Sequence, residues 1–128
     1  MSSFLNLVEV LTIHYDQIER YGGSHGIRDP GQLEAALFRP QSGYYEDTIA
    51  EAAALWESLS QNHPFIDGNK RTSFACCLTF LRINGLELMS NEAKTIQFLL
   101  PLYESSSLTY EVLEPWLREN VVTKSVDK

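Results

Sequence analysis

Residues 69–83 constrain the fold more than any other part of the chain, because their middle is apolar on nearly every side of a helix. A helix without a polar face must be covered by other elements, so this segment belongs at the centre of a bundle. Asn84 and Gly85 follow the segment and end the helix. Its apolar residues are Phe74, Ala75, Cys76, Cys77, Leu78, Phe80 and Leu81.

Two amphipathic helices are predicted before Pro40 and Gly43, which interrupt the helical pattern. Glycines 22 and 23 end the first, whose apolar stripe comprises Phe4, Leu7, Val8, Leu11, Tyr15 and Ile18. The second is short and ends near Arg39. Asp29 is its expected N-cap, Pro30 its first residue, and Gln32 is placed to close a capping box.

Three further helices complete a predicted bundle of about six. Thr48 and Glu51 have capping-box spacing, and the stripe behind them contains Ile49, Ala52, Ala53, Trp56 and Leu59. Ser90 or Asn91 caps the next helix, which Pro101 kinks or ends early. Thr109 starts the last helix, with Pro115 near its first turns. Only the loop at residues 40–46 resembles a strand or small hairpin.

Composition limits both the domain count and the partners. The chain has 128 residues, and we expect one domain over residues 1–122 with a flexible polar tail at 123–128. Its net charge of -7 disfavours general binding to nucleic acid or to anionic membranes. Adjacent cysteines rarely form a disulfide, so Cys76 and Cys77 are expected to be buried thiols in a reducing compartment. No signal peptide or bilayer-spanning stretch is evident, which predicts a cytoplasmic location.

The start of the central helix carries two cations where they are electrostatically unfavourable. Lys70 and Arg71 lie in its first turn, next to the partial positive charge and unpaired N–H groups of a helix N-terminus. A bound phosphate would remove this conflict, since helix N-termini bind anions through their free N–H groups. Gly68 lets the backbone turn tightly and approach that anion.

Other residues of the same segment extend the predicted phosphate site. Asp67 would repel a phosphate unless magnesium bridged the two, and a histidine such as His63 can take up a proton at neutral pH, as general-base chemistry requires. Asn69 is suited to capping the helix and to donating to a phosphate oxygen. This set of residues suits phosphoryl or nucleotidyl transfer. The spacing alone is equally consistent with a solvated histidine, an Asp-Gly turn and a solvated Lys-Arg pair.

The nine residues from His63 to Arg71 resemble the signature of the Fic/Doc family, and most closely the Doc branch with its pattern H-x-F-x-D-x-N-K-R. Further similarity lies in residues 26–29, 33–37, 39–41 and 80–85. The resemblance implies a compact all-α bundle of about six helices with a small flap, in agreement with the periodicity. It also implies transfer of part of a nucleotide to a hydroxyl on a target protein.

Two departures from the Fic pattern H-P-F-x-x-G-N-G-R-x-x-R favour a kinase. Lys70 replaces a glycine and Phe74 replaces the second arginine, whereas Gly68 is Fic-like. In the Doc branch the lysine accompanies reversed ATP binding, with the terminal phosphate at the helix N-terminus. The resemblance therefore implies a type II toxin that phosphorylates elongation factor Tu and inhibits translation, with ATP and Mg²⁺. The alternatives are a protein adenylyltransferase and a non-catalytic binding module.

The resemblance assigns a role to each site residue. His63 would accept or orient the hydroxyl proton, and Asp67 would hold Mg²⁺. Gly68, Asn69, Lys70 and Arg71 would bind phosphate, with Lys70 and Arg71 also stabilising the transferring charge. Phe65 would anchor the loop in the core.

Two partners follow from the same resemblance. A cognate antitoxin would fold a segment into a groove on the toxin. The flap would dock the target through main-chain pairing, and its expected residues are Arg39, Pro40, Gln41, Tyr44 and Tyr45. The two tyrosines are equally consistent with ordinary packing on the bundle.

Overall fold

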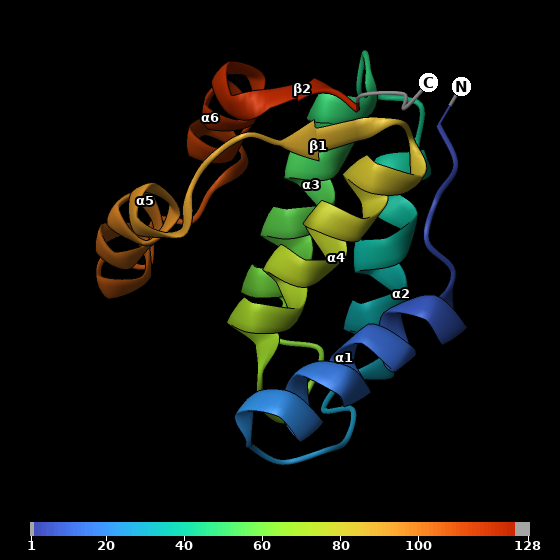
Figure 1. The fold of residues 1–128 in the computed structure, drawn as a ribbon. Coiled ribbons are helices and arrows are strands. Elements are labelled where there is room, and N and C mark those ends of the chain that lie inside the picture. The colour runs from blue at the N-terminus through green and yellow to red at the C-terminus, as the bar shows by residue number, and fades with distance from the viewer. Residues whose placement is uncertain (1, 125–128) are drawn as a thin grey trace.

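The computed structural model describes residues 2–124, which form a helical bundle with a small two-stranded sheet (Figure 1). The all-α expectation is confirmed. The elements are α1 (Leu7–Tyr21), α2 (Pro30–Phe38), a 3-10 turn (Arg39–Gln41), α3 (Thr48–Gln61), α4 (Asn69–Ile83), β1 (Leu86–Leu88), α5 (Glu92–Glu104), α6 (Tyr110–Asn120) and β2 (Val121–Thr123). No helix within residues 2–124 combines the length and apolar character needed to cross a bilayer.

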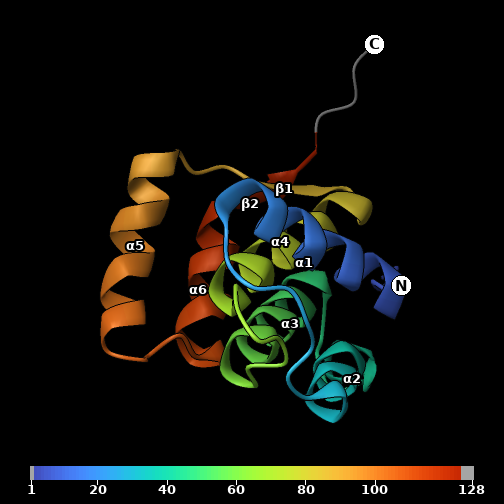
Figure 2. The ribbon, with the colours of Figure 1, turned by 90° about the horizontal axis from the view of Figure 1, so that it is seen from below.

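The predicted central helix is confirmed, with the predicted bounds. Seen from below, α4 lies between α1, α3 and α6, while α5 stands at the edge of the bundle (Figure 2). The closest packing is between α3 and α4, which run antiparallel. The side chains of Trp56 and Leu59 on α3 and of Cys76, Cys77 and Phe80 on α4 are completely buried. Burial raises the pKa of both thiols, of Cys76 to about 12, so they are neutral core groups.

The helix starts follow the capping rules, but not always through the expected residue. Asp29 caps α2 by accepting from the Gln32 N–H at 3.2 Å, whereas its own N–H donates to the Pro64 carbonyl. Asp47, and not Thr48, caps α3, because its carboxylate accepts from the Ala50 N–H at 2.9 Å. In α1 the N-cap is Asn6, with Glu9 completing a capping box.

The two prolines within predicted helices do not end them. Pro101 lies inside α5, which continues to Glu104, and Pro115 lies inside α6. Each proline removes one backbone donor and crowds the carbonyl four residues earlier, and packing of the apolar helix face compensates for that cost. Asn91 caps α5 by accepting from the Lys94 N–H.

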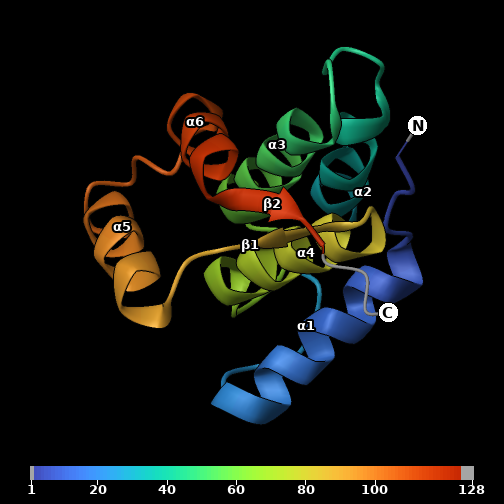
Figure 3. The ribbon, with the colours of Figure 1, turned by 45° about the horizontal axis from the view of Figure 1, so that its top comes forward.

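The strand prediction was wrong in its location. Residues 39–41 form a 3-10 turn, while β1 and β2 pair antiparallel with Leu86 opposite Thr123 (Figure 3). Strands of three residues are too short for an alternating pattern, and their pairing depends on a contact distant in sequence. Thr123 therefore belongs to the fold, and the Lys124 N–H donates to the Gly85 carbonyl. The rest of the expected tail, residues 125–128, lies outside the described residues.

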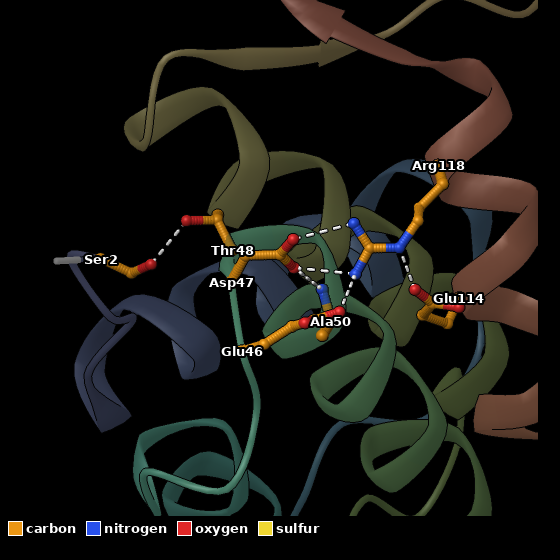
Figure 4. Close-up of polar contacts among 7 residues, drawn as sticks. All are labelled: Ser2, Glu46, Asp47, Thr48, Ala50, Glu114 and Arg118. Carbon is orange, nitrogen blue, oxygen red and sulfur yellow. Dashed lines mark hydrogen bonds and ion pairs between the residues drawn. The ribbon is translucent and has the colours of Figure 1, made fainter.

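An arginine on α6 holds the start of α3 in place (Figure 4). Arg118 donates to both carboxylate oxygens of Asp47, at 2.8 and 3.1 Å, and also contacts Glu46 and Glu114. The hydrogen bonds from Arg118 are the main cause that holds the pKa of Asp47 below its usual value. The cluster joins the 39–47 loop to the C-terminal half of the chain.

This cluster predicts an acid-dependent contribution to stability. Because the pKa of Asp47 is lowered in the folded protein, the contribution is present above the ordinary carboxyl pKa and is lost as pH falls through the lowered value. We expect Arg118→Gln to lower the free energy of unfolding by about 1 kcal/mol at pH 7, and by less at pH 3. Urea denaturation of both proteins at the two pH values measures this. Arg20→Gln, which removes an exposed ion pair within α1, is the control. If the difference in free energy of unfolding between the original protein and Arg118→Gln did not change with pH, the prediction would be contradicted.

Candidate active site

All six residues of the predicted phosphate site border one cavity at the start of α4. The loop of residues 62–68 joins α3 to α4 at the lower end of the bundle in Figure 1. The cavity has a volume of about 380 Å³. It is lined by His63, Ile66, Asp67, Gly68, Asn69, Lys70 and Arg71. The sequence segment therefore folds into a concave site.

Gly68 is the N-cap of α4, and its position requires glycine-like freedom. Its φ of 75° is in the left-handed region, and a Cβ atom there would lie 2.9 Å from Cδ1 of Ile18. No side chain caps this helix, and among the described residues no acceptor binds the N–H groups of residues 69–71. These three donors are available to an anion.

Asn69 does not cap the helix as predicted; it is the first helical residue and locks the preceding loop. Its Oδ1 accepts from the Phe65 N–H at 2.9 Å, and its Nδ2 donates to the Phe65 carbonyl at 3.0 Å. One amide hydrogen of Asn69 is left for a ligand. Phe65 is buried, in the anchoring position that the sequence suggested.

Asp67 presents an ionised carboxylate at the cavity. Its Oδ2 accepts from the Ser24 N–H at 3.1 Å and its Oδ1 accepts from the Gly68 N–H at 2.8 Å. These two bonds, the one from Ser24 first, lower the pKa of Asp67. Each oxygen keeps a lone pair directed elsewhere, so the carboxylate suits Mg²⁺. Within residues 2–124 no group of three His, Cys, Asp or Glu side chains gathers that could hold a metal ion.

The two cations lie at the edge of the site, each against an aromatic ring. The Lys70 ammonium is 5.0 Å from the centre of the Tyr103 ring on α5. Arg71 donates to the Gly22 carbonyl at 2.8 Å, and its guanidinium lies 5.7 Å from the centre of the Tyr21 ring. Burial raises the pKa of Tyr103 to about 12, so that ring is neutral beside the lysine.

His14 supports the site from α1, and sequence reasoning missed it. The side chain is buried, and its ring stacks on Phe65 with centroids 3.8 Å apart and planes at 5°. Its Nε2 lies 2.8 Å from the Asp67 carbonyl oxygen, so this nitrogen carries the proton. Burial is the main cause that lowers the pKa of His14. A single histidine within an apolar stripe carries no sequence signal of this role.

The segment beside the site is residues 22–28, and not the predicted flap. It contacts the site loop through Ser24 on Asp67, through the Gly26 carbonyl on the Ile66 N–H, and through an isolated antiparallel bridge from Ile27 to Phe65. In the sequence, Gly22 and Gly23 indicated only a helix end, and residues 26–29 were part of the family resemblance without a role at the site. Figure 1 shows the segment as the light-blue loop beside the start of α4.

The residues expected to form the flap lie at the other end of α2, at the top of Figure 1. Arg39 is used internally, donating to Glu57 at 2.5 Å and to the Tyr45 hydroxyl at 2.6 Å. Pro40 is buried, and the Gln41 side chain donates to the Leu37 carbonyl. Tyr44 is 83% exposed and does not line the cavity. The α2 helix carries the chain away from the site loop, so the structure does not bring this segment to the cavity.

The chain, a helical bundle with a candidate phosphate-binding site at the start of α4, matches a known protein family. The sequence profile of the Fic/DOC family matches residues 4–81, and the chain belongs to this family. The toxin Doc of Mycolicibacterium smegmatis is 42% identical over 96 residues, which cover 71% of this chain and 72% of that protein. The protein kinase doc of Escherichia phage P1 is 37% identical over 87 residues, covering 65% of this chain and 69% of that protein. Within the family the chain is therefore similar to the Doc proteins.

The buried His14 predicts how stability depends on pH. The unfolded chain binds a proton at the ordinary histidine pKa of 6.5, whereas the folded protein binds it only at lower pH. The free energy of unfolding therefore falls as pH decreases through 6.5. His14→Phe keeps a ring over Phe65 but leaves the Asp67 carbonyl without its donor, so we expect a loss of about 1–3 kcal/mol at pH 7.5. Urea denaturation at pH 7.5 and 5.5 tests both statements. Equal pH dependence in the two proteins would contradict the first.

Proposed function

We propose that this protein is a Doc-like toxin that transfers the terminal phosphate of ATP to a hydroxyl group on a target protein. The observation that carries the proposal is the uncapped start of α4, where free N–H groups, Lys70 and Arg71 share one cavity with Asp67 and His63. The name of the phage relative, a protein kinase, supports the same reaction. The proposed location is the cytoplasm.

The chain's own residues divide the work of phosphate binding. The N–H groups of residues 69–71 bind phosphate oxygens at the positive end of α4, and Lys70 and Arg71 neutralise the charge that develops during transfer. Mg²⁺, when bound, would supply further charge neutralisation. Asp67 is its proposed protein ligand, because its carboxylate is ionised and borders the cavity.

His63 orients the acceptor hydroxyl and takes its proton. The bond between the terminal phosphorus and the bridging oxygen of ATP breaks, a bond to the target oxygen forms, and ADP leaves. Since the transition state is loose, positioning of the hydroxyl contributes more than the basicity of His63. His63 is exposed at the rim of the cavity, where a protein hydroxyl has access.

Two residues favour phosphate transfer over AMP transfer. Lys70 occupies part of the space beside the helix start that a glycine would leave open. Phe74, at the position of the second Fic arginine, packs on Trp56 with ring centroids 5.2 Å apart and offers no charge to a phosphate. Both features fit an ATP molecule held by its terminal phosphate.

Two partners complete the proposal. The target, for which we propose elongation factor Tu, docks along residues 22–27, which contact the site loop. A cognate antitoxin covers the groove of about 510 Å³ between α4, β1 and α5. This groove shares Arg71 with the phosphate site, and Phe74, Leu78, Leu99 and Tyr103 give it an apolar wall.

The reaction is tested by labelling the two ends of the ATP phosphate chain separately. We expect purified protein with Mg²⁺ and elongation factor Tu to transfer label from [γ-³²P]ATP and none from [α-³²P]ATP. Transfer of the α label alone would identify an adenylyltransferase instead. Absence of both labels from the factor and from a whole-cell extract would refute phosphate transfer.

A substitution of His63 measures how much this residue contributes to the rate of phosphate transfer. We expect His63→Ala to lower the rate of transfer by about 10²–10⁴-fold, the usual range for loss of a general base. The exposed Tyr44 is the matched control, and Tyr44→Ala should keep the rate within twofold of the original.

The same variant separates an enzyme from a binding module. Expression of the original protein should arrest growth, whereas the His63→Ala variant should not. Equal arrest by both proteins would favour inhibition by binding over catalysis.

A further inference from the structure

Arg28 makes three hydrogen bonds to three consecutive carbonyl groups of the site loop. Its Nη2 donates to the Asn62 carbonyl at 2.8 Å, and its Nε donates to the His63 carbonyl at 2.5 Å. Its backbone N–H donates to the Pro64 carbonyl at 2.7 Å. One residue thus fixes the path of the chain immediately before and after His63.

His63 has a backbone conformation that needs such support. Its φ of 48° is in the left-handed region, and apart from Ser106 it is the only non-glycine residue within 2–124 with positive φ. This region is energetically unfavourable for any residue other than glycine, so the surrounding contacts must hold His63 in this conformation. Among the described residues, the only hydrogen-bond partner of the His63 backbone is Arg28.

The position of Arg28 also explains why a guanidinium group suits the binding of the Asn62 and His63 carbonyl groups. Asn62 is the C-cap of α3, so the carbonyls that follow lie at the negative end of that helix. A guanidinium group has a planar fork that reaches two adjacent acceptors, whereas a lysine ammonium offers a single centre. The neighbouring contacts, Asn69 with Phe65 and Gly26 with Ile66, fix the loop only after Pro64.

We propose that Arg28 is the positioning residue for His63: its bonds to the Asn62 and His63 carbonyls hold the histidine in the left-handed conformation from which it meets the acceptor hydroxyl. This inference rests on the proposed function for its effect on catalysis, but the conformational part stands independently of it. Arg28 does not line the phosphate cavity, and its guanidinium group is bound to the site loop and not offered to the target. Its loss lowers turnover and leaves nucleotide binding intact.

The first test measures conformation and needs no activity. NMR scalar couplings and chemical shifts of labelled His63 report its φ in the original protein, in Arg28→Met and in Arg28→Lys. We expect positive φ only in the original protein, with averaging in both variants and unchanged shifts in the helices. Arg20→Met is the control: it removes an exposed arginine that lies on α1, and it should leave the φ of His63 unchanged. Retention of positive φ in Arg28→Met would overturn the proposal.

The second test uses the kinetics of phosphate transfer. We expect Arg28→Met to lower kcat at least tenfold while KM for ATP stays within twofold, with Arg28→Lys showing most of the loss. In the His63→Ala background, Arg28→Met should cause no further loss, because the two residues act as one unit. An equal loss in both backgrounds, or a rise in KM alone, would overturn the positioning role.

The two tests also separate this inference from the reaction itself. If the original protein transfers no phosphate while φ of His63 responds to the loss of Arg28 as expected, the proposed function fails. The conformational effect of Arg28 on the His63 backbone then still holds. If phosphate is transferred and Arg28→Met retains kcat, the proposed function remains and the positioning role fails.

Discussion

The antiparallel packing of α4 against α3 is the interaction on which the rest of the structure depends. Complete burial of Trp56 and Leu59 against Cys76, Cys77 and Phe80 fixes the two helices side by side, so the chain must reverse direction within residues 62–68. That reversal leaves the start of α4 without a side-chain cap and brings its free N–H groups to the surface. The same apolar packing that stabilises the fold therefore creates the electrostatic conditions for an anion site.

The site loop is held from outside by residues 14–28 of the N-terminal region. His14 bonds to the Asp67 carbonyl, Ser24 to the Asp67 carboxylate, and Arg28 to the carbonyls around His63. His63, Asp67 and Arg71 thus each have a structural partner on α1 or on the loop after it, whereas Lys70 lies against Tyr103 on α5. Such support from a second element is what keeps a surface loop in one reactive geometry.

Much of the fold, and every residue that lines the cavity except Ile66, could be predicted from sequence. The bounds of α4 and the cap of α2 follow from hydrophobic pattern and capping chemistry, which act over a few residues. The cap of α3 was misplaced by one residue, because Asp47 and Thr48 are both suitable caps and Arg118, 71 positions away, favours the carboxylate. The strands β1 and β2 were missed for a similar reason, since each is stabilised only by pairing with the other.

The sequence by itself determined the chemistry of the site, because the lining residues fall between His63 and Arg71 and a buried helix must follow them. Only the tertiary structure decided which residues hold that chemistry in place. Local patterns encode helical period, turns and caps, but they do not encode which distant side chain meets a given carbonyl. His14 and Arg28, 53 and 35 residues from their partners, could be found only after the chain had folded. The same holds for the segment beside the site, which packing placed at residues 22–28 and not at residues 39–45.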